Sequence, residues 1–118
     1  MAKAEELLKE LAALRRKLVI VEGPKDRTAL VQLSLRNVVV LRGPIHLFVE
    51  RIAHSGIKEV VILSDLDREG RAIYGRLKAE LARAGIAVDD SFRNWLFRHT
   101  PLRQIEGLPS YLEKLRRR

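Results

Sequence analysis

The chain has 118 residues, with 23 lysines and arginines against 15 aspartates and glutamates, and a formal net charge of +8 at pH 7. This length predicts a single domain with a buried core, and the positive charge favours a polyanionic partner, above all nucleic acid. The absence of cysteine excludes disulfides, zinc-thiolate sites and cysteine nucleophiles, and no apolar run reaches the roughly 18 residues of a membrane span.

The N-terminal residues lack the apolar stretch of a signal peptide, so we expect a cytoplasmic protein with no membrane partner. Charged residues make up 32% of the chain, whereas Asn and Gln are scarce. This bias is typical of heat-adapted proteins and predicts a thermophilic source.

Residues 3–16 predict an amphipathic helix packed on the rest of the domain. Leu7, Leu11 and Leu14 recur at helical spacing, with acidic residues in the first turn and basic residues in the last.

Three strand-helix units follow in series, which predicts a parallel sheet. Each unit is a short apolar run followed by helical spacing: 18–21 with 25–35, 37–41 with 45–56, and 60–63 with 69–84. The runs are continuously apolar, as expected for strands that helices cover on both faces. Gly75 lies inside the third of these helices and predicts close contact between helix and sheet there.

Beyond Gly85 two assignments are open. Residues 86–88 form a fourth strand, followed by a helix that Asp89 or Asp90 caps, or else residues 95–97 form that strand. Residues 102–105 predict an edge strand, and residues 109–115 predict a terminal helix.

Carboxylates follow two of the predicted strands. Glu22 comes after the first strand, and Asp65, Asp67 and Glu69 come after the third. Because the carboxyl ends of parallel strands meet at one edge of a sheet, we expect a shared acidic pocket that suits Mg²⁺, which in turn would bind substrate phosphates. The alternative is structural: Asp65 and Asp67 cap a turn and a helix, and Glu22 is a solvated loop acid.

These motifs resemble the Toprim domain shared by type IA topoisomerases, bacterial-type primases, gyrase-class subunits and small nucleases that mature ribosomal RNA. The first motif is an apolar strand ending in Glu22-Gly23, and the second is a strand ending in Asp65-Leu66-Asp67. Glu69 follows as the third acid of the topoisomerase version.

The resemblance covers about residues 18–88 and implies a Toprim-like α/β fold. Such a fold is a three-layer sandwich whose mostly parallel central sheet, of about four strands, is flanked by helices. Residues 1–17 are then an N-terminal helix, and residues 89–118 are a C-terminal extension of the same domain.

The resemblance also implies a site. Asp65 and Asp67 would hold Mg²⁺, or Mn²⁺ in its place, with Glu69 as a third ligand, often through water. Glu22 would share the metal or act as general acid and base. The metal stabilises charge on the transferring phosphate and orients the attacking group.

Three basic residues beside the acids, Lys25, Arg68 and Arg71, are candidate phosphate contacts. The chain has no room for the strand-passage gate of a topoisomerase or for the flanking domains of a primase.

We therefore predict a magnesium-dependent nuclease that cleaves phosphodiester bonds through Glu22, Asp65 and Asp67, in structured RNA more than in DNA. The alternative is a non-catalytic nucleic-acid-binding or adaptor module that works with a protein partner in a processing complex. A third candidate is a phosphotransfer enzyme or phosphohydrolase for small molecules. The oligomeric state is open.

Overall fold

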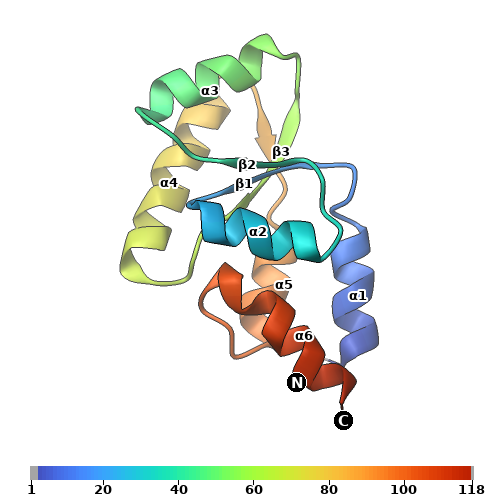
Figure 1. Ribbon diagram of the computed structural model, residues 1–118. Coiled ribbons are helices and arrows are strands. Elements are labelled where there is room, and N and C mark those ends of the chain that lie inside the picture. The colour runs from blue at the N-terminus through green and yellow to red at the C-terminus, as the bar shows by residue number, and fades with distance from the viewer. Residues whose placement is uncertain (1–2, 118) are drawn as a thin grey trace.

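A four-stranded sheet with all strands parallel forms the centre of the molecule (Figure 1). The structure is a computed structural model that describes residues 3–117. The strand order is β2-β1-β3-β4, and the strands are β1 (Leu18–Val21), β2 (Val38–Val40), β3 (Glu59–Leu63) and β4 (Ala87–Val88).

Helices connect and flank the strands. They are α1 (Ala4–Ala12), α2 (Pro24–Gln32), α3 (Ile45–His54), α4 (Arg68–Arg83), α5 (Ser91–His99) and α6 (Leu108–Arg116), with a short 3₁₀ turn, η1 (Ile105–Gly107), before the last. No helix within residues 3–117 is both long and apolar enough to cross a membrane.

The helices form two layers, one on each face of the sheet (Figure 1). Alternate strand residues point to opposite faces, so Val19 and Val21 of β1 pack with α1, α2, α5 and α6, whereas Ile20 packs with α3 and α4. The same alternation divides the fully buried side chains of β3. Burial on both faces explains why the strands are continuously apolar, and the predicted three-layer α/β fold is confirmed.

The C-terminal part decides between the assignments that the sequence left open. β4 and α5 confirm the strand at residues 86–88 and the helix after it, and residues 95–97 lie within α5. The predicted edge strand at residues 102–105 is wrong: this segment is irregular and ends in η1. Its main-chain groups pair with the turn after β3 instead of with a strand, because Leu66 N donates to Arg103 O at 2.8 Å.

The N-terminal helix is shorter than predicted and ends at Ala12 instead of continuing to residue 16. Leu14 is nevertheless buried, because the turns that follow the helix, such as Leu14 N to Leu11 O at 3.0 Å, keep it against the core.

The prediction for Gly75 is also wrong. Gly75 is exposed, and a Cβ atom there would meet nothing within 4 Å. Gly70 makes the close contact instead: a Cβ atom on it would lie 2.1 Å from the carbonyl oxygen of Asp65. The first turn of α4 therefore packs directly on the backbone that leaves β3, and only glycine fits.

Lys17, just before β1, forms ion pairs with residues at the ends of β3 and β4. Its ammonium lies 3.2 Å from Glu59 Oε1 at the start of β3, and it also pairs with Asp89, which follows β4. The hydrogen bond from Lys17, helped by Ser91, lowers the pKa of Asp89 to about 2. The pair is partly exposed, so we expect a modest contribution to stability.

Gly70→Ala is expected to lower the free energy of unfolding by about 3 kcal/mol, because the added methyl group would overlap the Asp65 carbonyl. The matched control is Gly75→Ala in the same helix, which should raise stability by about 0.5–1 kcal/mol by restricting the unfolded chain. Denaturant unfolding of both variants measures this difference. Equal effects at the two positions would contradict the close packing at Gly70.

Asp89→Asn is expected to lower stability at pH 7 by about 1 kcal/mol, because Asn keeps the acceptor for Ser91 N but loses the charge that pairs with Lys17. A carboxyl group with a depressed pKa stabilises the fold above its unfolded value and loses this effect as pH falls, here between about 4 and 2. The difference between variant and wild type should therefore shrink as pH falls from about 4 to 2 and vanish below the folded-state pKa in urea unfolding. Glu113→Gln, which removes an exposed ion pair with Arg117, serves as the control and should change little at either pH.

Candidate metal centre

The register between β1 and β3 brings two distant acids together. Val21 pairs with Leu63 at the ends of the two parallel strands, so the residues that follow each strand leave the sheet side by side. Asp65 N consequently donates to Glu22 Oε2 at 3.3 Å.

A third carboxylate, Asp26, joins them from the first turn of α2. Asp26 is buried, and its Oδ2 accepts a hydrogen bond from Gly23 N at 3.2 Å. Oxygen atoms of Glu22, Asp26 and Asp65 all lie within 4.8 Å of one another. Sequence analysis missed Asp26, which looked like an ordinary acid in a first helical turn. Its only signal was its place one turn after the Glu-Gly motif.

The acidic cluster, defined as Glu22, Asp26 and Asp65, has no salt-bridge partner within residues 3–117, although Glu22 and the Arg93 guanidinium attract each other at longer range. Burial, followed by repulsion from Asp65, Asp67 and Asp26, raises the pKa of Glu22 to about 7, against an opposing hydrogen bond from Asp65 N. Burial and then the charge of Asp65 likewise raise the pKa of Asp26.

The donor set fits a hard divalent cation. It offers only carboxylate oxygens, and opposite ligands of Mg²⁺ are separated by about 4.2 Å, twice the metal-oxygen distance of about 2.1 Å. A cation at this point would also relieve the repulsion that, together with burial as the larger cause, raises the pKa of Glu22. The acidic cluster is thus a candidate metal centre.

Two of the expected metal ligands lie outside the acidic cluster. Asp67 is exposed and caps α4, where its Oδ1 accepts a hydrogen bond from Gly70 N at 2.7 Å. Its charge still contributes to the raised pKa of Glu22, so it is close enough to act on the site. Glu69 is exposed in the first turn of α4.

The turn between β3 and α4 is held from several sides. Ser64 Oγ donates to Gly70 O at 2.8 Å, which closes the turn on itself. From the C-terminal segment, Ile105 N donates to Asp65 Oδ1 at 2.9 Å. A main-chain donor supplied by an irregular segment has no sequence signature, and sequence analysis accordingly missed it.

Arg93 of α5 lies behind the same turn. It is buried, and its guanidinium donates to the carbonyl oxygen of Asp65 at 3.3 Å and to Ser64 Oγ at 3.5 Å. The guanidinium carbon lies 4.3 Å from the ring centroid of Tyr74 and 5.1 Å from that of Phe97. These cation-π contacts stand in for a carboxylate partner, because no described ion pair includes Arg93.

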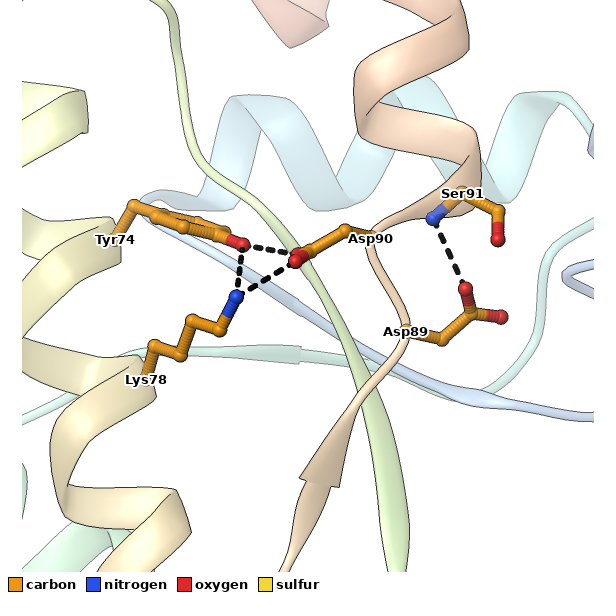
Figure 2. Close-up of polar contacts among 5 residues, drawn as sticks. All are labelled: Tyr74, Lys78, Asp89, Asp90 and Ser91. Atoms are coloured by element: carbon orange, nitrogen blue, oxygen red, sulfur yellow. Dashed lines mark hydrogen bonds and ion pairs between the residues drawn. The ribbon is translucent and has the colours of Figure 1, made fainter.

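A polar network fixes the Tyr74 ring on which Arg93 rests. Figure 2 shows the Tyr74 hydroxyl and the Lys78 ammonium converging on the carboxylate of Asp90, just before α5. Lys78 Nζ donates to Asp90 at 2.7 Å and to the Tyr74 hydroxyl at 3.3 Å. The network joins α4 to α5, and so steadies both helices that border the turn.

The three candidate phosphate contacts, Lys25, Arg68 and Arg71, are all exposed in the first turns of α2 and α4. Both helices begin at the edge of the sheet where the acidic cluster lies. Helix N-termini favour anions, so these two turns present positive potential on either side of the cluster.

Comparison with known proteins identifies the family. The Toprim domain matches residues 17–92, which include Glu22, Asp26 and the turn after β3. A UPF0292 protein of Methanocaldococcus jannaschii is 32% identical over 93% of this chain and 92% of its own length. A UPF0292 protein of Methanosarcina acetivorans is 35% identical over 95% of this chain and 81% of its own.

A solved structure of a protein from Aquifex aeolicus has the same fold. It superimposes with a TM-score of 0.77 at 34% identity, and the match covers 87% of this chain and 95% of the other. The match along residues 17–92 and the relatives that align over most of the chain show that the chain belongs to the Toprim-domain family and, within it, to the UPF0292 proteins.

Proposed function

We propose that this protein is a magnesium-dependent nuclease that cleaves phosphodiester bonds in nucleic acid. The observation that carries the proposal is the acidic cluster: three carboxylates without a salt bridge among residues 3–117 meet at the carboxyl edge of a Toprim sheet, and the pKa of one is about 7. Strongly perturbed groups of this kind gather at functional sites. We rank structured RNA before DNA, because the small nucleases that the chain resembles act on ribosomal RNA.

Glu22, Asp26 and Asp65 are the residues proposed to hold the metal, Mg²⁺ or Mn²⁺. When bound, the cation would stabilise negative charge on the phosphate and orient the attacking oxygen. Ile105 N keeps one oxygen of Asp65 in place through its hydrogen bond, while Arg93 holds the main chain of the same residue.

Glu22 is proposed either as a ligand of the metal or as the proton carrier, because a cation bound directly to its carboxylate would lower the pKa that the metal-free protein has. With a pKa of about 7 its carboxylate takes up and releases a proton near neutral pH, which is the property a general acid or base requires. Asp67 and Glu69 are exposed beside the acidic cluster, and we assign them contacts through water. Lys25, Arg68 and Arg71 would bind phosphates on either side of the scissile bond.

A second candidate function is a non-catalytic nucleic-acid-binding module in a processing complex. The observation that favours it is the position of Asp67, which caps α4 and lies outside the acidic cluster. In that case the cation orders the turn after β3 for binding, and the chemistry belongs to a protein partner.

Glu22→Gln is expected to stabilise the metal-free protein at pH 8. The folded-state pKa of Glu22 is raised from 4.5 to about 7, so the unfolding free energy of wild type falls as pH rises through this window. Gln removes that penalty and also a metal ligand. In thermal unfolding with EDTA, the unfolding temperature of the variant should be higher than that of wild type at pH 8. At pH 4 the two unfolding temperatures should lie closer together.

Added Mg²⁺ should make wild type more stable than Glu22→Gln and so reverse their order of stability. Wild type should gain about 2.7 kcal/mol at a Mg²⁺ concentration of 100 times the dissociation constant, and the variant far less. Glu50→Gln, an exposed acid on α3, is the control and should follow wild type throughout. A wild type that Mg²⁺ does not stabilise would contradict the metal centre.

Asp65→Asn and Asp67→Asn are expected to slow cleavage by at least about 100-fold, because each removes negative charge that the metal centre uses. The measurement is magnesium-dependent cleavage of end-labelled RNA and DNA, each tested as single strand, duplex and hairpin. Glu113→Gln, far along α6, should cleave as wild type does.

The result separates the two candidate functions. Cleavage by wild type but not by the two variants supports the nuclease and identifies its substrate class. Binding without cleavage by wild type assigns the protein to the non-catalytic module. Full activity of Asp67→Asn would remove Asp67 from the mechanism.

A further inference from the structure

The outer edge of β2 has main-chain groups that face away from the sheet. β2 is an edge strand, and it bonds to β1 through Asn37 O and Leu41 N, each at 2.8 Å. Main-chain groups alternate sides along a strand, so those of Val38 and Val40 point outward. Of these outward groups, Val38 O accepts a hydrogen bond from Arg27 Nε at 3.1 Å. The N–H of Val38 and both groups of Val40 therefore face outward. Val38 as a whole is only 4% exposed, whereas Val40 is half-buried, so Val40 supplies the accessible main-chain groups of this edge.

An apolar cavity of about 420 Å³ lies against this edge, between β2 and α3. Its apolar wall consists of Leu18, Val39, Val40, Phe48, Ile52 and Ile57. The side chain of Val40 packs on the opposite face of the sheet, so its presence in this wall places the cavity directly beside the strand edge. The volume is in the range that holds a large side chain or a small ligand.

The polar part of the lining is cationic. Arg42 and Arg51 are exposed at the cavity, Ser55 completes it, and no acidic residue lines it. No ion pair described within residues 3–117 includes either arginine. Arg36, just before β2, is also exposed, so basic residues stand at both ends of the strand.

We propose that β2 is a docking strand for an extended acidic segment of a protein partner. The segment would pair with the main-chain groups of Val40 and place one apolar side chain in the cavity. Its acidic residues would lie beside Arg42 and Arg51. Strand addition of this kind takes affinity from main-chain hydrogen bonds and specificity from the side-chain pocket.

Charge argues against a second copy of this chain as the occupant. Two β2 strands paired antiparallel would bring Arg42 of one copy opposite Arg36 of the other, and like charges facing each other across strands are destabilising. Nucleic acid fits the cations but not the rest of the surface. Bases need an exposed aromatic platform, and the one aromatic residue of the cavity, Phe48, is 6% exposed.

The docking strand is separate from the candidate metal centre. The acidic cluster lies where β1 and β3 end, whereas the docking strand faces outward from the far side of β1. The cavity lining shares no residue with the acidic cluster, so changes in peptide binding and in metal binding can be measured separately. The proposal does not depend on the nuclease.

The test uses the full chain labelled with ¹⁵N and the peptide acetyl-Glu-Asp-Val-Leu-Val-Asp-Glu-amide. We expect saturable amide shifts centred on β2 and α3, with a dissociation constant below about 1 mM. The same peptide with Lys in place of its acidic residues should not bind. Absence of saturable shifts, or shifts centred elsewhere, would overturn the proposal.

Two variants and one competitor sharpen the test. Val40→Pro removes an outward donor without removing a bond to β1, and Arg51→Glu reverses the charge at the cavity; each should weaken peptide binding about tenfold. Arg15→Glu makes the same charge change on another surface and should leave binding unchanged. An equal loss with Arg15→Glu, or displacement of the peptide from β2 by a single-stranded oligonucleotide, would count against a protein partner.

Discussion

Repulsion among carboxylates at the end of β1 and β3 is the constraint on which the rest of this structure depends. Parallel pairing in register leaves Glu22 and Asp65 next to each other, and α2 adds Asp26. A fold gains nothing in stability from such an arrangement, since burial and mutual repulsion together raise the pKa of Glu22 to about 7. A bound cation would remove the repulsive part of this cost. This cost in the metal-free protein is the strongest physical reason to regard the acidic cluster as functional.

The surroundings of the acidic cluster are built to hold it in place. Gly70 lets α4 approach the main chain of Asp65, and Arg93 fixes that main chain from behind. Two aromatic rings stabilise the guanidinium. Arg93 therefore needs no acidic partner, which would place another carboxylate in an already acidic region. Its Nε has no hydrogen-bond partner, which marks this support as one with an energetic cost of its own.

Segments outside the family match contribute to the same site. Ile105 N binds Asp65 Oδ1, and Arg103 O accepts from Leu66 N, although the Toprim match ends at residue 92. The C-terminal extension thus helps to support the candidate metal centre, and it also covers the sheet face on which α1 packs. Variation in this extension would therefore alter how the turn after β3 is held.

The sequence by itself determined the sheet, the order of its elements and the position of two acids. Continuous apolar runs predict buried parallel strands, and acids directly after two such strands must meet at one edge, so Glu22 and Asp65 were placed from pattern alone. Only the tertiary structure decided the rest. Asp26 joins through the direction in which α2 leaves β1, and Gly70 replaces Gly75 as the close contact through the docking of α4. Residues 102–105 do not form the predicted strand, because their main-chain partners lie in the turn after β3. Such contacts depend on the relative placement of packed elements, which local spacing along the chain does not encode.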